Sequence, residues 1–192
     1  MTPRLGRLLA GALLPALTAA CSPAAAPGVD DAPAARRAQL EGDQPAPPFR
    51  VLTSKGAIID SADLIGRRAT LVVFFTTWCK VCDRALPLVR EALAQQGGEV
   101  TAFAVSLDDV DTWPAVPAYL DKHGLEMPVV RGAYHAPFVM DYDPALGIPV
   151  VVVIGKGGRV VDVQRGWAAG QEARLRAALE AARVVPPSAP PG

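Results

Sequence analysis

The chain has 192 residues, of which 51% are apolar, with 19 basic and 19 acidic side chains and a formal net charge of zero. An apolar content of this size excludes an intrinsically disordered protein and suffices for one domain with a core. The balanced charge, without a basic stripe, argues against nucleic acid as a partner.

The N-terminus has the composition of a secretory signal peptide, predicted to cover residues 1–20. Two arginines precede an apolar run over 8–20, which is too short to span a bilayer comfortably. The run ends in LTAAC, which resembles the lipobox of bacterial lipoproteins and predicts a lipid on Cys21. Thr18 stands where a lipobox usually has leucine, so an ordinary signal peptidase that leaves Cys21 as a free thiol is the alternative.

Residues 21–45 are rich in alanine and proline and are predicted to be a lipid-anchored flexible linker. Such a tether would hold the folded domain, residues 46–185, on the periplasmic side of a membrane. Ser22 after the cysteine favours the outer membrane, by resemblance to lipoproteins. The proline-rich end, residues 186–192, is predicted to be a disordered tail.

Strand-like and helix-like segments alternate within the domain. The pattern predicts a hairpin over 49–60, a turn or short helix over 61–68, a buried strand over 69–76, a helix over 80–96, a buried strand over 99–108, a helix over 111–124, an extended piece over 127–132, an irregular or briefly helical segment over 134–147, a hairpin over 150–166 and a helix over 170–183. This order predicts an α/β fold with a parallel core, to which the last hairpin adds an antiparallel edge.

Two of the three cysteines lie in FFTTWCKVCDRALP, residues 74–87. A disulfide between Cys79 and Cys82 would close so short a loop that it would add little stability, which favours a redox role. The strand-to-helix junction puts Cys79 at or just before the first helical turn, where free backbone N–H groups favour its thiolate. Cys82 lies one turn further in and is expected to be more shielded. Lys80 adds positive charge near Cys79.

The segment Trp78-Cys79-Lys80-Val81-Cys82, with Pro87 five residues later, resembles the thioredoxin superfamily. Gly147-Ile148-Pro149, ahead of a buried strand, resembles the cis-proline segment of that family. The segment VSLDD…W…YLDKHGLEMPVV resembles the central insertion of extracytoplasmic thiol-disulfide oxidoreductases of the TlpA/ResA type.

This resemblance implies a thioredoxin-like fold, a central mixed sheet flanked by helices, with an N-terminal hairpin and the central insertion. Cys79 would attack a disulfide and Cys82 would resolve the mixed disulfide, closing a Cys79–Cys82 disulfide without a cofactor or metal. The residues expected to contact substrate are Trp78, Lys80, Val81, Ile148 and Pro149. The implied protein is a monomeric, membrane-tethered protein disulfide reductase that acts on extracytoplasmic protein disulfides or dithiols and is supplied by a membrane thiol donor.

The sequence departs from the family at two positions. Thioredoxins have an acid where this chain has Val73, and TlpA/ResA-type proteins often have glutamate where it has Ala85. Without these proton acceptors, resolution by a shielded Cys82 is expected to be slow near neutral pH. Asp83 is the first candidate for the role if resolution is fast.

Three other chemistries use the same thiols. A zinc site would need ligands beyond the pair, but the two histidines, His123 and His135, are not at ligand spacing. A peroxidase of the peroxiredoxin type is the second, because Thr76-x-x-Cys79 matches part of that signature. A copper-delivery module is the third, although its candidate ligands Met127 and Met140 are scattered.

The remaining polar and aromatic residues have structural interpretations. His123 is expected at a helix C-terminus, and His135 on the surface. Asp108, Asp109 and Asp111 are expected to form a solvated turn with a helix cap. The aromatic residues expected to serve packing are Trp113, Tyr119 and Trp167.

Overall fold

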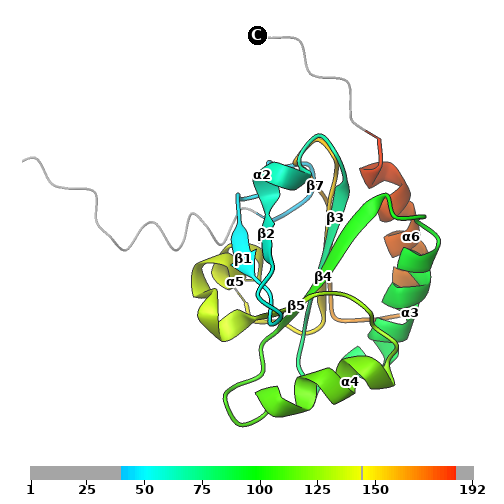
Figure 1. The fold of residues 1–192 in the computed structure, drawn as a ribbon. Coiled ribbons are helices and arrows are strands. Elements are labelled where there is room, and N and C mark those ends of the chain that lie inside the picture. Colours follow the sequence, from blue (N-terminus) through cyan, green and yellow to red (C-terminus); the bar gives the residue numbers. More distant parts are fainter. Residues whose placement is uncertain (1–39, 144, 185–192) are drawn as a thin grey trace, which may run out of the picture.

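The computed structural model describes residues 40–143 and 145–184, which form a mixed five-stranded sheet with helices on both faces (Figure 1). The strands lie in the order β5-β4-β3-β6-β7, and β1 and β2 form a separate hairpin. The elements are β1 (Arg50–Leu52), β2 (Ile58–Asp60), α2 (Ser61–Leu64), β3 (Ala69–Phe75), α3 (Cys82–Ala94), β4 (Val100–Ser106), η1 (Trp113–Ala115), α4 (Val116–Lys122), β5 (Val129–Arg131), η2 (Gly132–Tyr134), α5 (Ala136–Tyr142), β6 (Val150–Ile154), β7 (Val160–Arg165) and α6 (Gln171–Ala182).

Strand β3 is the centre of the sheet, because every one of its seven residues is buried. It pairs in parallel with β4 and antiparallel with β6. The last hairpin therefore contributes one whole side of the sheet, next to the central strand, and β7 alone is its antiparallel edge. The predicted mixed α/β sheet is confirmed, while the strand order follows from pairings that local patterns do not encode.

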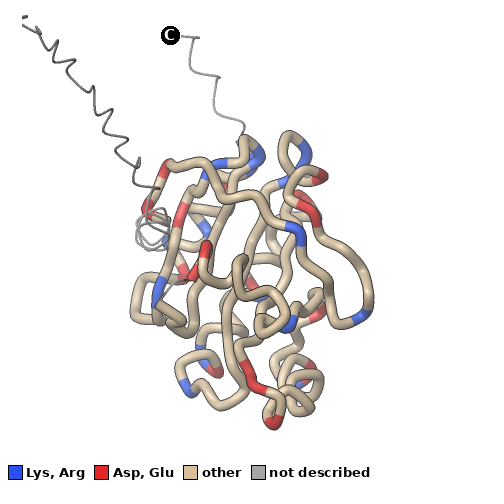
Figure 2. Tube along the Cα trace, turned by 90° about the vertical axis from the view of Figure 1, so that its left-hand side faces the viewer, with Lys and Arg blue, Asp and Glu red and all other residues tan. Residues whose placement is uncertain are grey.

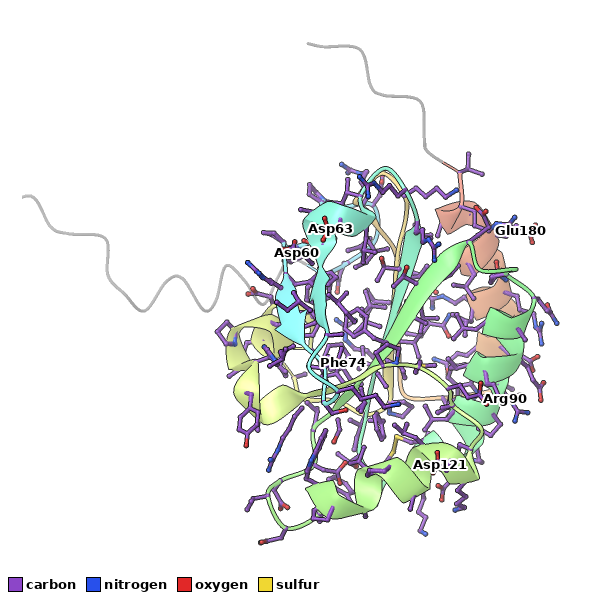
Figure 3. The ribbon with its side chains drawn as sticks, viewed as in Figure 1. Asp60, Asp63, Phe74, Arg90, Asp121 and Glu180 are labelled. Atoms are coloured by element: carbon purple, nitrogen blue, oxygen red, sulfur yellow. A yellow bond between two sulfur atoms is a disulfide. The ribbon has the colours of Figure 1, made fainter. Side chains whose placement is uncertain are left out.

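Two apolar cores lie on opposite faces of this sheet. One core joins β3 to α3, α4 and α6 and contains both Cys79 and Cys82. The other lies under the N-terminal hairpin and α5, where Phe74 packs against Phe138 with ring centroids 5.9 Å apart (Figure 3). Alternation along β3 divides its side chains between the two cores, as a strand buried on both faces requires.

Helix α4 lies across the end of the sheet at which β3 and β4 terminate (Figure 1). The predicted helix over 111–124 is divided into η1 and α4, since Pro114 and Pro117 each lack an N–H and lie in a first turn. Helix α3 begins at Cys82, two residues later than predicted. It ends before Gly97 and Gly98, whose positive φ values carry the chain out of the helix.

The described part of the predicted linker packs on the domain. Leu40 is buried in the second core, and Pro45 forms an isolated bridge with Arg159. Folded structure therefore extends to Leu40, ahead of the predicted start at residue 46. The predicted signal peptide over 1–20, the predicted linker up to residue 39 and the predicted tail over 186–192 lie outside the described residues.

Basic and acidic residues alternate over the described surface and do not gather on one face (Figure 2). Within the same residues, no helix is both long and apolar enough to cross a membrane.

Candidate active site

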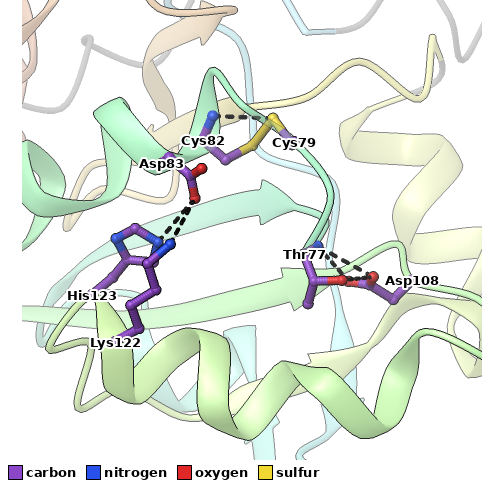
Figure 4. Close-up of a disulfide and its surroundings, with 7 residues drawn as sticks. All are labelled: Thr77, Cys79, Cys82, Asp83, Asp108, Lys122 and His123. Atoms are coloured by element: carbon purple, nitrogen blue, oxygen red, sulfur yellow. Dashed lines mark hydrogen bonds and ion pairs between the residues drawn. A yellow bond between two sulfur atoms is a disulfide. The ribbon is translucent and has the colours of Figure 1, made fainter.

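A disulfide joins Cys79 and Cys82 at the junction between β3 and α3 (Figure 4). Six residues, 76–81, separate the end of β3 at Phe75 from the first helical residue, Cys82, and Cys79 is one of them. The Cα atoms of the two cysteines are 5.2 Å apart. Because β3 and β4 run in parallel, this junction lies at the carboxyl edge of the sheet, where α/β folds commonly carry their sites.

The Cys79 sulfur faces the amino end of α3. The Cys82 backbone N–H donates to Cys79 Sγ at 3.1 Å, and the Asp83 N–H donates to the Cys79 carbonyl. The Cys82 N–H is one of the groups that a helix start leaves without an intrahelical partner, and it favours negative charge on the sulfur that it faces. The Asp83 N–H instead makes the first helix-type hydrogen bond. Cys79 is 6% exposed and Cys82 is fully buried, so the expected difference in shielding is present but small.

The loop between β3 and Cys79 is anchored by Asp108 from the end of β4. Its carboxylate accepts hydrogen bonds from the Thr77 N–H, the Thr77 hydroxyl and the Ser106 hydroxyl. Asp108 is 1% exposed, so the prediction of a solvated turn is wrong at this position. The prediction of a solvated turn is right for Asp109. Its side chain is exposed and accepts hydrogen bonds from the backbone N–H groups of Asp111 and Thr112, just ahead of η1.

The residues predicted to contact substrate differ in exposure. Trp78 is 63% exposed and Lys80 is exposed beside it. Val81 and Ile148 are half-buried and pack against the core that holds both cysteines. Pro149 is buried and follows a cis peptide bond. The fold thus brings Val81 and Ile148, 67 residues apart, to the same core as the disulfide.

A buried carboxylate that the sequence did not reveal supports the cis-proline segment. Asp143 is fully buried at the end of α5, and its Oδ1 accepts from the Gly147 N–H at 3.1 Å. Burial raises the pKa of Asp143 to about 6, although the Gly147 hydrogen bond and the charge of Arg165 oppose the rise. The sequence does not predict this buried acid, because the apolar residues around Asp143 follow no regular helical or strand period.

A second cluster connects α3 to the end of α4 (Figure 4). The Asp83 carboxylate, next to Cys82, accepts from His123 Nε2–H at 3.1 Å and lies 3.8 Å from Lys122 Nζ. Burial acts to raise the pKa of Asp83, but the Tyr119 hydroxyl, the Lys122 charge and the His123 hydrogen bond outweigh burial and hold that pKa below its usual value. His123 is at the helix C-terminus, as predicted, but its partner on α3 was not predicted.

The two family positions for an acid are apolar and buried. Val73 and Ala85 are both 0% exposed, so neither position supplies a proton acceptor to Cys82. His135 accepts a hydrogen bond from the Leu52 N–H, away from the cysteines in sequence and element. Among the described residues, no group of three or more histidine, cysteine, aspartate or glutamate side chains is arranged to hold a metal ion.

Trp113 and Trp167 pack against the first core, as predicted. Tyr119 also packs there, its ring stacked on Phe75 at 5.7 Å. Cys21, the predicted lipidation site, lies outside the described residues.

A Cys-x-x-Cys disulfide at a helix start and a cis-proline segment packed against the same core, on this sheet, define a thioredoxin-like protein. Residues 41–179 match the family model described as Redoxin, and the chain belongs to that family. The chain is 28% identical over 136 residues to the thiol-disulfide oxidoreductase ResA of Bacillus thuringiensis (strain Al Hakam), covering 67% of this chain and 72% of that relative.

Solved structures share the fold. One is a thiol:disulfide interchange protein of the thioredoxin family from Chlorobium tepidum, with a TM-score of 0.60 and 24% identity over 75% of this chain and 99% of that one. StoA from Bacillus subtilis has a TM-score of 0.55 and 19% identity, over 69% and 96% of the two chains. The fold, the vicinal cysteines and the family together identify a thiol-disulfide oxidoreductase of the TlpA/ResA-like group.

Proposed function

We propose that this protein reduces disulfides of extracytoplasmic partner proteins, tethered to a membrane by a lipid on Cys21. The Cys79 thiolate attacks a substrate disulfide, forms a mixed disulfide and releases one substrate sulfur as a thiolate. Cys82, after losing its proton, attacks Cys79 Sγ and displaces the second substrate sulfur. The substrate disulfide gains two electrons, and the two cysteines lose them and become the Cys79–Cys82 disulfide. A membrane dithiol donor then reduces this disulfide.

The observation that carries this proposal is the hydrogen bond from the Cys82 N–H to Cys79 Sγ at 3.1 Å. In the reduced protein the same N–H would stabilise a thiolate on Cys79. Cys79 also keeps an exposed fraction of 6%, whereas Cys82 is fully buried. An attacking thiol needs both ionisation and access, and a resolving thiol needs only to reach its neighbour. The assignment of Cys79 as attacker and Cys82 as resolver rests on this difference.

The substrate is proposed to lie across Trp78 and Ile148 as an extended strand. Exposed Trp78 offers an apolar surface, and Lys80 offers positive charge beside the disulfide. Val81 and Pro149 complete the proposed contact. Pro149 O already accepts from the Gly166 N–H at 2.8 Å, so the backbone of Ile148 is the group left to pair with a substrate strand.

The extracytoplasmic location is supported by the signal-like residues 1–20. The proposed layout is a signal peptide over 1–20, a lipidated linker over 21–45, a domain over 46–185 and a tail over 186–192. The working form is proposed to be a monomer.

The two alternative chemistries gain no support from the described residues. Met127 packs against the first core, while Met140 lies on α5, the helix that contributes to the second. The two methionines therefore lie on opposite faces of the sheet, and only Met127 is on the face that holds the cysteines. The peroxidase alternative is disfavoured by the relatives, which are named as disulfide oxidoreductases or interchange proteins.

The direction of electron flow is tested in living cells by trapping thiols with a reagent that adds mass. A reductase fed by a dithiol donor is expected to hold Cys79 and Cys82 mostly reduced, so that both react with the reagent. The double variant Cys79→Ser/Cys82→Ser is the matched control, because it lacks both thiols and shows how much reagent the rest of the chain takes up. A pair that is mostly oxidised at steady state contradicts the proposal and indicates an oxidase.

A further inference from the structure

Resolution of the mixed disulfide requires Cys82 to lose a proton inside the protein. Cys82 is fully buried, and burial disfavours the thiolate. The two positions at which the family has an acid, on β3 and on the buried face of α3, are occupied here by Val73 and Ala85. The proton acceptor must therefore come from another part of the site.

Partly exposed Asp83 and buried His123 form a polar connection beside Cys82. In Figure 4 the Asp83 side chain lies between the disulfide and the side chains of Lys122 and His123. Its Oδ1 makes both polar contacts, at 3.1 Å to His123 Nε2 and 3.8 Å to Lys122 Nζ. His123 is only 7% exposed, and its ring lies 4.6 Å from that of Tyr119, a member of the core that contains both cysteines.

The other charged groups near the disulfide are committed elsewhere or exposed. Asp108 uses its carboxylate to hold Thr77 and Ser106. Lys80 ahead of α3, Arg84 on α3 and Asp121 on α4 are exposed to solvent. The Lys122 ammonium group has donors and no acceptor atom. Burial, together with the hydrogen bond to Asp83 and its charge, raises the pKa of Tyr119, which keeps its hydroxyl neutral.

We propose that Asp83 and His123 act together as the proton acceptor for Cys82. In the reduced protein the neutral His123 ring carries its proton on Nδ1, Asp83 takes the Cys82 proton and passes it to Nε2, and the resulting imidazolium Nε2–H donates to Asp83 across the 3.1 Å contact. This inference rests on the proposed reductase cycle and adds two residues to it. The Cys82 S–H proton passes to the pair, directly or through one water, and the Cys82 thiolate displaces the substrate sulfur from Cys79. Reduction of the disulfide returns the proton to Cys82.

The chemistry suits a cycle that runs near neutral pH. Histidine is the side chain whose charge ordinarily changes between about pH 5 and 8, and a carboxylate hydrogen-bonded to one ring nitrogen orients the ring and stabilises the imidazolium. Asp83 is held ionised by its neighbours, so it is ready to accept a hydrogen bond from a thiol. His123, at the end of α4, together with Asp83 thus supplies the proton acceptor that Val73 and Ala85 do not provide.

The two thiol steps can be observed separately with 5,5′-dithiobis(2-nitrobenzoic acid), which releases one coloured thiolate at attack and a second at resolution. The full chain is used with Cys21→Ser, so that the third thiol does not react. The reduced protein is mixed with less than one equivalent of reagent, and the second release is then a unimolecular step.

In Asp83→Asn and His123→Gln, the second release is expected to slow on the order of 10²-fold at pH 7, the lower end of what a positioned acid–base group contributes. The first release is expected to stay fast. The second release should recover as pH rises, because hydroxide then removes the Cys82 proton. Asp83→Glu, which keeps the carboxylate, should retain most of the rate, and the exposed control Asp121→Asn should match wild type.

Unchanged second releases in Asp83→Asn and His123→Gln overturn the inference. Slowing that a higher pH does not relieve also overturns it, because a misplaced helix α4 is not repaired by hydroxide. Because Asp83 is partly exposed, Asp83→Asn is expected to fold, and it tests the inference by itself if His123→Gln fails to fold. Absence of the first release in wild type would instead reject the proposed function itself.

Discussion

The Asp108 carboxylate accepts hydrogen bonds from both the hydroxyl and the backbone N–H of Thr77, at 2.6 and 3.1 Å. This pair ties the end of β4 to the loop that delivers Trp78 and Cys79. The loop makes few other polar contacts that fix its path, since Thr76 Oγ1 has no hydrogen-bond partner among the described residues. The geometry of the attacking sulfur therefore depends on an acid 29 residues away from it.

Asp108→Ala is expected to destabilise the fold and slow the first attack by Cys79. The change leaves the N–H and hydroxyl of Thr77 and the hydroxyl of Ser106 without their acceptor, which costs on the order of 1–3 kcal/mol in a buried site. Urea unfolding and the rate of the first release of coloured thiolate measure the two effects. Asp109→Ala, at the exposed cap, is the matched control and should leave the attack rate unchanged. Equal rates in Asp108→Ala and wild type would show that Asp108 does not hold the loop.

Single cysteine variants are expected to separate attack from resolution. Cys79→Ser removes the stabilised thiolate and should abolish reduction of insulin disulfides. Cys82→Ser should still attack and then accumulate mixed disulfides, because nothing displaces the substrate from Cys79. Non-reducing electrophoresis of cell extracts measures the trapped species. If Cys79→Ser accumulates them and Cys82→Ser does not, the two roles are reversed.

Asp143 is expected to make the protein less stable as pH rises from about 4 to 6. Its pKa is raised from the usual 3.8 to about 6, so the folded state binds more protons than the unfolded state in this interval. Stability is therefore full below the lower value and is lost as pH rises through the higher one, by on the order of 2–3 kcal/mol.

Asp143→Asn tests this dependence, because the amide oxygen keeps the Gly147 hydrogen bond without a charge. Urea unfolding of both proteins from pH 4 to 8 gives the difference between them, which removes the contributions of other acids. The variant is expected to gain stability relative to wild type as pH rises. Parallel curves for the two proteins would mean that Asp143 does not titrate in this interval.

Cys21 is expected to be the acylated N-terminus of the mature protein, because LTAAC follows a short apolar run. Mass spectrometry of protein extracted from membranes should find the lipid on Cys21, and Cys21→Ser should release the protein from the membrane fraction. An unmodified mature chain that starts at another residue rules out this anchor.

The sequence alone determined the elements and the redox pair. Strand runs such as 69–76, the hairpins and the helix that follows Cys79 are encoded by local periodicity and turn residues, and the structure contains all of them. The two cysteines also needed no tertiary information, because their spacing at a strand-to-helix junction already brings the sulfurs together. Local patterns erred mainly at helix starts, where Cys82, and not Lys80, is the first helical residue.

The tertiary structure decided which distant groups meet at the site. β6 pairs with the central β3 although 74 residues separate the ends of the two strands, and this pairing puts Ile148 into the core of the cysteines. Asp108 looked like a surface turn and is buried, and Asp83 meets His123 from across 40 residues. The reason is physical: local sequence sets backbone preference, but burial and hydrogen-bond partners depend on which elements pack together, and that is settled only when the whole sheet forms.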